Sequence, residues 1–231
     1  MMKWILALLC VVSPLTMQAQ DSLTVGLKAD IVNQYIWRGQ NLGHASLQPE
    51  MSVSWKGLCL AASGSTSIDS EDFREVDLTL AYTTGGLSMG VVDYWSDDCD
   101  PRYFYYKTSE TGHTFEGFIG YDFGFLNASW QTIFAGNDLS ADDGKRTYSS
   151  YLQLAAPFRL ANCNWEACVG MVPWKAAYYG TKGFEVTNVS LAVTKDIRIT
   201  DSFSLPVYGR MIANPATQHL YFVAGFTLKV F

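Results

Sequence analysis

Residues 30–40 read DIVNQYIWRGQ, and residues 47–55 read LQPEMSVSW. Apolar and polar residues alternate in both stretches, and Gly39 interrupts the alternation between them. Successive side chains of a β-strand point to opposite faces, so each stretch predicts a strand with one apolar and one polar face. The glycine permits the turn that leads from one strand towards the next.

The same alternation recurs to the end of the chain and predicts about twelve strands. The predicted strands span 22–38, 46–56, 58–67, 73–84, 86–95, 113–123, 125–135, 147–157, 163–174, 184–195, 202–213 and 219–231. Most have close to the ~9–11 residues that a tilted strand needs to cross a bilayer. Tight turns such as 84–86 alternate with longer loops such as 96–112 and 136–146. Short turns at one end and long loops at the other are typical of outer-membrane barrels.

A soluble β-sandwich is the alternative, because it also buries the apolar faces of alternating strands. Three observations favour a barrel. The polar faces carry charged and amide side chains that a dry sandwich core could not satisfy. The chain ends on Phe231, an aromatic terminus typical of bacterial outer-membrane barrels. Tyr and Trp, which suit a membrane interface, gather at the loop ends of predicted strands, at Tyr35, Trp37, Trp95, Tyr148 and Trp174.

We therefore predict an all-β fold, a transmembrane antiparallel up-and-down β-barrel of about twelve strands. An even number of strands places both ends of the barrel domain on the short-turn, periplasmic side. Outer-membrane lipid is then the expected surrounding of the barrel. The strand that ends at Phe231 is expected to meet the outer-membrane assembly machinery.

The chain has 231 residues, a net charge of −6 and a pI of about 5.0. Nucleic-acid-binding proteins usually present a basic face, so this acidic balance argues against a nucleic-acid partner. Residues 1–19 have the pattern of a secretory signal, because Lys3 precedes an apolar run that is too short to span a membrane as a helix. We predict a signal peptide at 1–19, a barrel domain at 20–231, and export to the bacterial outer membrane.

Four cysteines follow the predicted signal peptide, and an exported protein can pair cysteines. Cys163 and Cys168 fall on opposite faces of one predicted strand, so they cannot bridge each other there. We interpret the four mainly as small core or wall residues. The sequence leaves open whether disulfides form among Cys59, Cys99, Cys163 and Cys168.

One stretch carries a family resemblance. The pattern Tyr35-Ile36-Trp37-Arg38-Gly39, followed by Gln48-Pro49, resembles the TorF-type porin family of Gram-negative bacteria. The specific match covers roughly residues 29–55, and the rest of the chain matches only in the regular succession of predicted strands. The resemblance implies an outer-membrane barrel with a solute-pore role, and it carries over no catalytic residues.

Arg38 is the most specific candidate for a site, because its parity places it on the polar face with Asp30 and Gln34. We expect it at the rim of the barrel, where it meets Glu50 across the first hairpin. In one interpretation this pair forms part of a charge filter, as rings of charged side chains do in pores. In the other it is an ion pair that fills and rigidifies a narrow barrel. The predicted pore-lining residues are Asp30, Gln34, Arg38, Glu50, Glu116 and Arg210.

Other combinations of reactive residues are weaker. The pair His44 and Ser46 has the spacing of some lipid hydrolases, but both residues share parity with the inner face, whereas a lipid hydrolase needs them on the membrane face. His113 and Glu116 are too few for a metal site, which wants three or four convergent ligands. The loop aspartates, such as Asp97 and Asp100, are expected to be solvated rather than to hold calcium. We predict no catalytic residues, no metal and no cofactor.

The leading functional prediction is a narrow porin-like channel for the passive passage of small solutes. Two alternatives stay open. One is a non-conducting barrel that acts as a surface binding or structural protein through its loops, and the other is an outer-membrane lipid-modifying enzyme.

Overall fold

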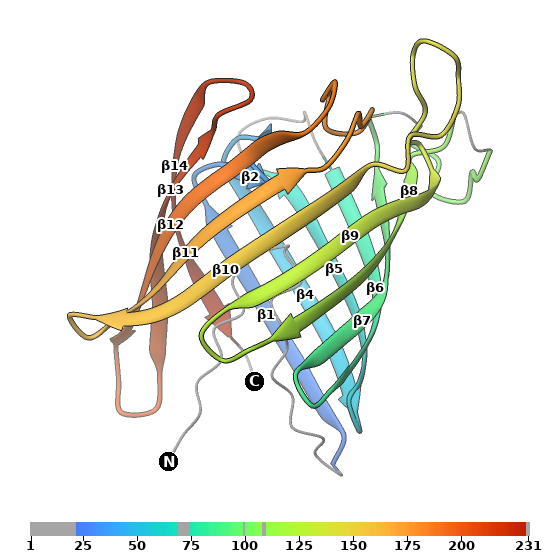
Figure 1. Cartoon of the computed structure of the whole chain (residues 1–231). Coiled ribbons are helices and arrows are strands. Elements are labelled where there is room, and N and C mark those ends of the chain that lie inside the picture. The colour runs from blue at the N-terminus through green and yellow to red at the C-terminus, as the bar shows by residue number, and fades with distance from the viewer. Residues whose placement is uncertain (1–21, 69–73, 99, 108–109, 230–231) are drawn as a thin grey trace.

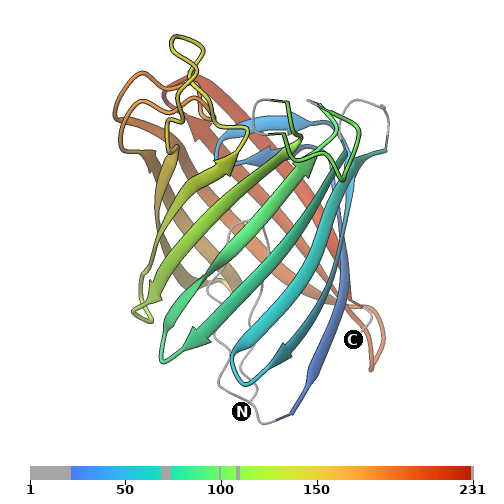
Figure 2. The same ribbon diagram turned by 90° about the vertical axis from the view of Figure 1, so that its right-hand side faces the viewer.

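The computed structural model describes residues 22–68, 74–98, 100–107 and 110–229. Their strands close into a twelve-stranded antiparallel barrel, which confirms the predicted fold (Figures 1 and 2). The barrel strands are β1 (Thr24–Val32), β4 (Ser46–Trp55), β5 (Leu58–Ser67), β6 (Arg74–Thr84), β7 (Leu87–Ser96), β8 (His113–Asp122), β9 (Asn127–Gly136), β10 (Ser150–Leu160), β11 (Cys163–Val172), β12 (Glu185–Arg198), β13 (Ser204–Asn214) and β14 (His219–Lys229).

Each strand pairs with its sequence neighbour in the barrel wall, and the wall is closed where β1 meets β14. At that seam Asp30 lies opposite Thr227, and on its other side β1 places Lys28 opposite Glu50 of β4. The connections at the end of the barrel where β1 begins are short, from two residues between β4 and β5 to five between β12 and β13. The turn between β4 and β5 has positive φ at both Lys56 and Gly57, the geometry of a two-residue hairpin whose twist matches that of its strands.

Large apolar side chains cover the outer surface of this wall. Leu60, Leu80, Met211 and Phe222 are each between 47% and 60% exposed, and their polar strand neighbours face the lumen. Water would penalise an apolar belt of this size, whereas lipid would not. The fold therefore fits an outer-membrane protein. No helix among the described residues is long and apolar enough to cross a membrane.

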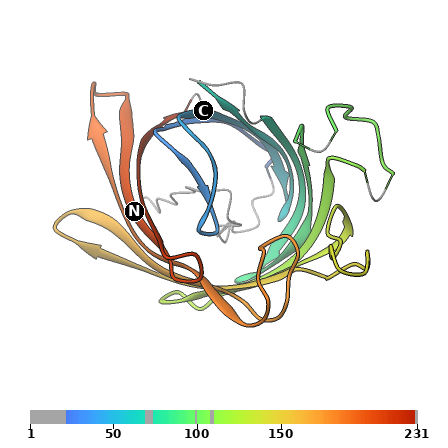
Figure 3. The same ribbon diagram turned by 90° about the horizontal axis from the view of Figure 1, so that it is seen from above.

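The first predicted strand, 22–38, is wrong in its second half. The wall strand β1 ends at Val32, and the chain then forms a separate hairpin of β2 (Tyr35–Trp37) and β3 (Gln40–Gly43). Viewed from above, this hairpin leaves the wall and projects into the barrel opening (Figure 3). We call residues 35–43 the lumenal hairpin.

Asn33 explains why the chain leaves the wall after β1. Its backbone N–H donates to Ala224 O, its side-chain amide donates to Phe222 O, and its side-chain oxygen accepts from Ala224 N. These bonds complete the pairing with β14 and free the following residues to turn inward. Tyr35 and Trp37 are consequently buried, 5% and 4% exposed, so their predicted place in an external aromatic girdle is wrong.

Some predictions concern residues that the structure does not describe. The signal peptide at 1–19, Cys99 and the terminal Phe231 lie outside the described residues. Within the described part of the chain, Cys59, Cys163 and Cys168 are free thiols, and Cys59 and Cys168 are buried.

Candidate functional site

Arg38 lies at the tip of the lumenal hairpin, with Gly39 as the other residue of its two-residue turn. Both residues have positive φ, 49° and 81°, as such a turn requires. The guanidinium reaches across the lumen to Glu116 of β8 and forms two parallel hydrogen bonds of 2.6 and 2.8 Å. This bidentate geometry matches the planar fork of arginine to a carboxylate. Arg38 is 2% exposed and Glu116 is fully buried, so the pair lies inside the barrel and not at its rim.

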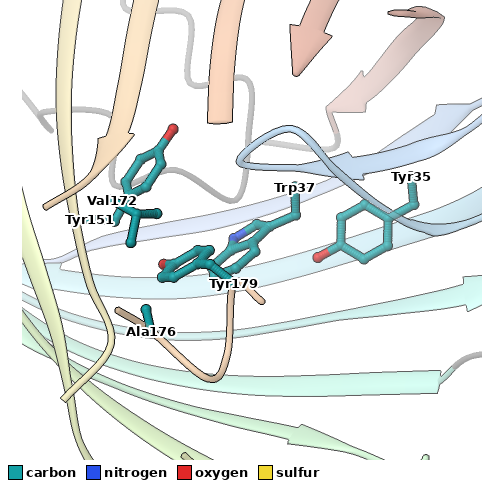
Figure 4. Packing of buried hydrophobic residues seen from close by; sticks show 6 residues of the cluster. All are labelled: Tyr35, Trp37, Tyr151, Val172, Ala176 and Tyr179. Atoms are coloured by element: carbon teal, nitrogen blue, oxygen red, sulfur yellow. The ribbon is translucent and has the colours of Figure 1, made fainter. Parts of the chain in front are cut away.

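Aromatic rings surround the Arg38 guanidinium. It lies over the rings of Trp37 at 4.3 Å and of Tyr151 at 4.7 Å, and it donates a 2.5 Å hydrogen bond to the Tyr179 hydroxyl. Trp37 in turn stacks on Tyr179 with the ring centroids 5.9 Å apart. Figure 4 shows these rings together with Tyr35 and Val172. Cation–π contacts of a desolvated guanidinium contribute about 2 kcal/mol, so the rings hold the hairpin tip in addition to the ion pair.

Tyr179 comes from the loop between β11 and β12, which therefore also folds over the lumen. Burial raises the pKa of the Tyr179 phenol well above its usual range. The phenol therefore stays neutral. A guanidinium has donors and no acceptor, so Arg38 is the donor of this hydrogen bond and the Tyr179 oxygen accepts it.

Further contacts fix the hairpin to other walls of the barrel. The Tyr35 hydroxyl donates to Glu75 of β6 at 2.7 Å, and the Asn214 amide of β13 donates to Gly39 O at 3.0 Å. Ile36 packs in a buried cluster with Ile212 of β13. The hairpin is thus attached to β6, β8 and β13, and it narrows the lumen near the loop end of the barrel.

Gly39 is required at the hairpin turn for a steric reason as well as for its φ. A Cβ at this position would lie 1.9 Å from Thr187 O of β12. We expect Gly39→Ala to displace the hairpin tip, because positive φ alone costs about 1–3 kcal/mol for a non-glycine residue and the clash adds to it. The urea midpoint of the detergent-solubilised barrel should fall, and trypsin should gain access to Arg38.

Gly144→Ala is the matched control for this substitution. Gly144 also has positive φ, 68°, but nothing lies within 4 Å of a Cβ built on it. The control shares the backbone strain and lacks the clash. Equal effects of the two substitutions on tryptic cleavage after Arg38 would show that the packing against Thr187 does not hold the hairpin.

The structure brings two of the six predicted pore-lining residues together, namely Arg38 and Glu116. The predicted contact between Arg38 and Glu50 is wrong, because Glu50 forms its salt bridge with Lys28 of the adjacent strand at 3.0 Å. The inward turn after β1 carries Arg38 away from β4, which explains the error. Gln34 lies half-buried in the link between β1 and β2.

The remaining predicted residues lie on the inner wall. Asp30 accepts a hydrogen bond from Thr227 across the seam. Arg210 of β13 is 6% exposed and donates to the Ser190 hydroxyl of β12 at 3.3 Å. The sequence did not point to the aromatic partners of Arg38. The pair Tyr178-Tyr179 inside an otherwise small and polar predicted loop was the available signal that this loop folds inward.

The other candidate sites separate in the structure. His44 is exposed, whereas Ser46 is buried and accepts a hydrogen bond from Gln48. His113 is buried and lies between the Asp93 carboxylate at 2.8 Å and the Tyr103 carbonyl at 2.5 Å. It therefore ties the loop after β7 to the barrel. Among the described residues, no group of three or more His, Cys, Asp or Glu side chains is arranged to hold a metal.

Several acidic loop residues have basic partners. Asp97 pairs with Arg74 at 2.8 Å and Asp142 pairs with Lys175 at 2.5 Å. Asp100 pairs with Arg102 at 2.6 Å, and this guanidinium lowers the pKa of the Asp100 carboxyl to about 2. These carboxylates are therefore engaged in surface ion pairs.

A scan against protein-family models found no match for this chain, and a search of curated proteins found none either. The resemblance of residues 29–55 to TorF-type porins therefore stays a prediction. The described strands form a closed twelve-stranded barrel whose lumen is narrowed by the lumenal hairpin.

Proposed function

We propose that this protein is a narrow porin-like channel of the bacterial outer membrane, through which small solutes pass by diffusion. The observation that carries the proposal is the lumenal hairpin, held inside a closed barrel by the bidentate Arg38–Glu116 pair. A loop folded into a barrel sets an upper limit on the size of what passes beside it. Membership of the TorF-type family is part of this proposal.

The inner wall supports a hydrated lumen. Gln131, Gln153 and Asn188 are buried on the inner face, and each has a side-chain oxygen with no hydrogen-bond partner among the described residues. Buried polar atoms without protein partners are costly unless water satisfies them. A barrel of twelve strands is also intermediate between small barrels filled by side chains and open porins. Both features suit a narrow aqueous passage.

Arg38 and Glu116 suit a positioning role better than acid–base chemistry. Their charged ends bind each other, and the other side-chain hydrogen bonds of the two residues are with tyrosine hydroxyls, those of Tyr179 and Tyr94. We therefore assign the pair to holding the hairpin, and we propose no catalytic activity.

Liposome swelling tests the channel. Purified barrel reconstituted into liposomes should admit a monosaccharide and exclude a trisaccharide, because the hairpin narrows the lumen. Liposomes made with the heat-unfolded protein are the control, and a shift in gel mobility on heating verifies that the reconstituted sample is folded. Liposomes that stay impermeable to every solute would reject the channel and favour a non-conducting binding or structural barrel.

A further inference from the structure

We infer that this passage prefers small cationic solutes to anions, because the inner face of β6 carries two carboxylates without a cationic partner. This inference rests on the proposed channel function. It names the class of solute that the same lumen favours.

Glu75 and Asp77 lie two residues apart on β6, and their side chains therefore share the inner face. They are 8% and 4% exposed. Glu75 accepts a hydrogen bond from the Tyr35 hydroxyl of the lumenal hairpin at 2.7 Å, and Asp77 accepts one from the Ser63 hydroxyl at 3.3 Å. Within the described ranges no salt bridge reaches either carboxylate, and the second oxygen of Asp77 has no hydrogen-bond partner.

Four other acidic residues among those described on the inner wall lie near basic side chains, and for Asp30 the basic neighbour is Lys28. Glu116 is paired with Arg38, and Glu50 with Lys28. Glu166 of β11 and Arg210 of β13 lie in one row across the wall, since both are register partners of Ala192. The basic side chains of this part of the lumen therefore lie beside those acids, whereas the two carboxyl groups of β6 have no ion-pair partner among the described residues.

The position of these carboxylates gives them influence over passage. Glu75 touches the lumenal hairpin, so it lies at the level where the lumen is narrowed. Asp77 lies two residues further along β6. It is the register partner of Ser63 on β5, which is in turn the register partner of Glu50 on β4. Charge of one sign at a constriction with low-dielectric walls concentrates counter-ions and repels ions of the same sign.

The test is ion selectivity in a planar lipid bilayer, measured from the reversal potential under a gradient of potassium chloride at pH 9, because buried neighbouring carboxyl groups without a cation ionise only at higher pH than free ones. The wild-type channel should pass potassium over chloride by roughly tenfold, the low end of the concentrating effect of a charged cleft. The double variant Glu75→Gln with Asp77→Asn should bring this permeability ratio close to one. Glu166→Gln is the matched control on the opposite wall and should leave the ratio near the wild-type value.

Heat-modifiable gel mobility verifies that each variant is folded, and Asp77→Asn alone serves if the double variant does not assemble. A wild-type barrel that conducts without preferring potassium overturns this inference but still supports the proposed channel function. A preference for potassium that survives in the folded double variant overturns it in the same way. A folded wild-type barrel with no conductance rejects the proposed function, and the inference with it.

Discussion

Replacing Glu116 by alanine is expected to release the lumenal hairpin and to destabilise the barrel by about 3–5 kcal/mol, the usual penalty for removing one partner of a buried ion pair. The variant leaves the Arg38 guanidinium among the rings of Trp37 and Tyr151 without its carboxylate. A charge left unpaired in such surroundings is poorly solvated, so the hairpin should swing towards water. Urea unfolding in detergent measures the loss of stability, and tryptic cleavage after Arg38 reports the release.

Two further variants test whether the loss of stability comes from breaking the Arg38–Glu116 pair. Arg38→Met combined with Glu116→Leu removes both charges and should recover most of the lost stability, because an apolar pair of similar volume avoids the buried charge. Glu110→Ala breaks the exposed pair with Lys107 and should leave the unfolding midpoint unchanged, since solvent screens such pairs. If Glu116→Ala behaves like Glu110→Ala, the buried pair does not anchor the hairpin.

Removing the hairpin itself should have the largest effect on passage. When residues 35–43 are replaced by a short Gly-Ser linker, β1 and β4 keep their pairing and Asn33 keeps its bonds to β14. The obstruction across the lumen is then gone. We expect the single-channel conductance to rise severalfold, and the reconstituted liposomes to admit the trisaccharide that the wild type excludes.

A second deletion serves as the control for this experiment. Residues 141–145 form an exposed tip of the loop between β9 and β10, outside the lumen. Removing them also shortens a loop, as the replacement of residues 35–43 does, but it should leave the conductance unchanged. A hairpin deletion that folds and conducts no better than the wild type would show that the narrowest point of the lumen lies elsewhere.

The wall of the barrel could be predicted from the sequence because its determinants are local. The predicted strands 46–56 and 58–67 differ from β4 and β5 by at most one residue, since alternation and turn residues decide both. The inward facing of Glu116 and Arg210 also followed from parity alone.

The lumenal hairpin could not be predicted in the same way. Alternation continues from Val32 into Tyr35-Ile36-Trp37, and nothing local marks the point where the chain leaves the wall. That point depends on Asn33 binding to β14, whose residues lie 189 and 191 positions away in the sequence. Likewise Glu50 was the natural partner for Arg38 by proximity in sequence, but the true partner, Glu116, is 78 residues away. The Arg38-Gly39 pair suits a two-residue turn, but it does not show whether that turn lies in the wall or in the lumen.

The contacts of the hairpin also constrain the order in which the molecule can be assembled. Residues near the N-terminus depend on partners 78, 141 and 175 positions further along the chain, at Glu116, Tyr179 and Asn214. Closing such long segments is entropically unfavourable until the strands between them are in place. The lumen is therefore narrowed only after the C-terminal strands have been added. A resistant Arg38 in a pulse of trypsin would thus mark molecules that have completed their barrel and distinguish them from those still open at the seam.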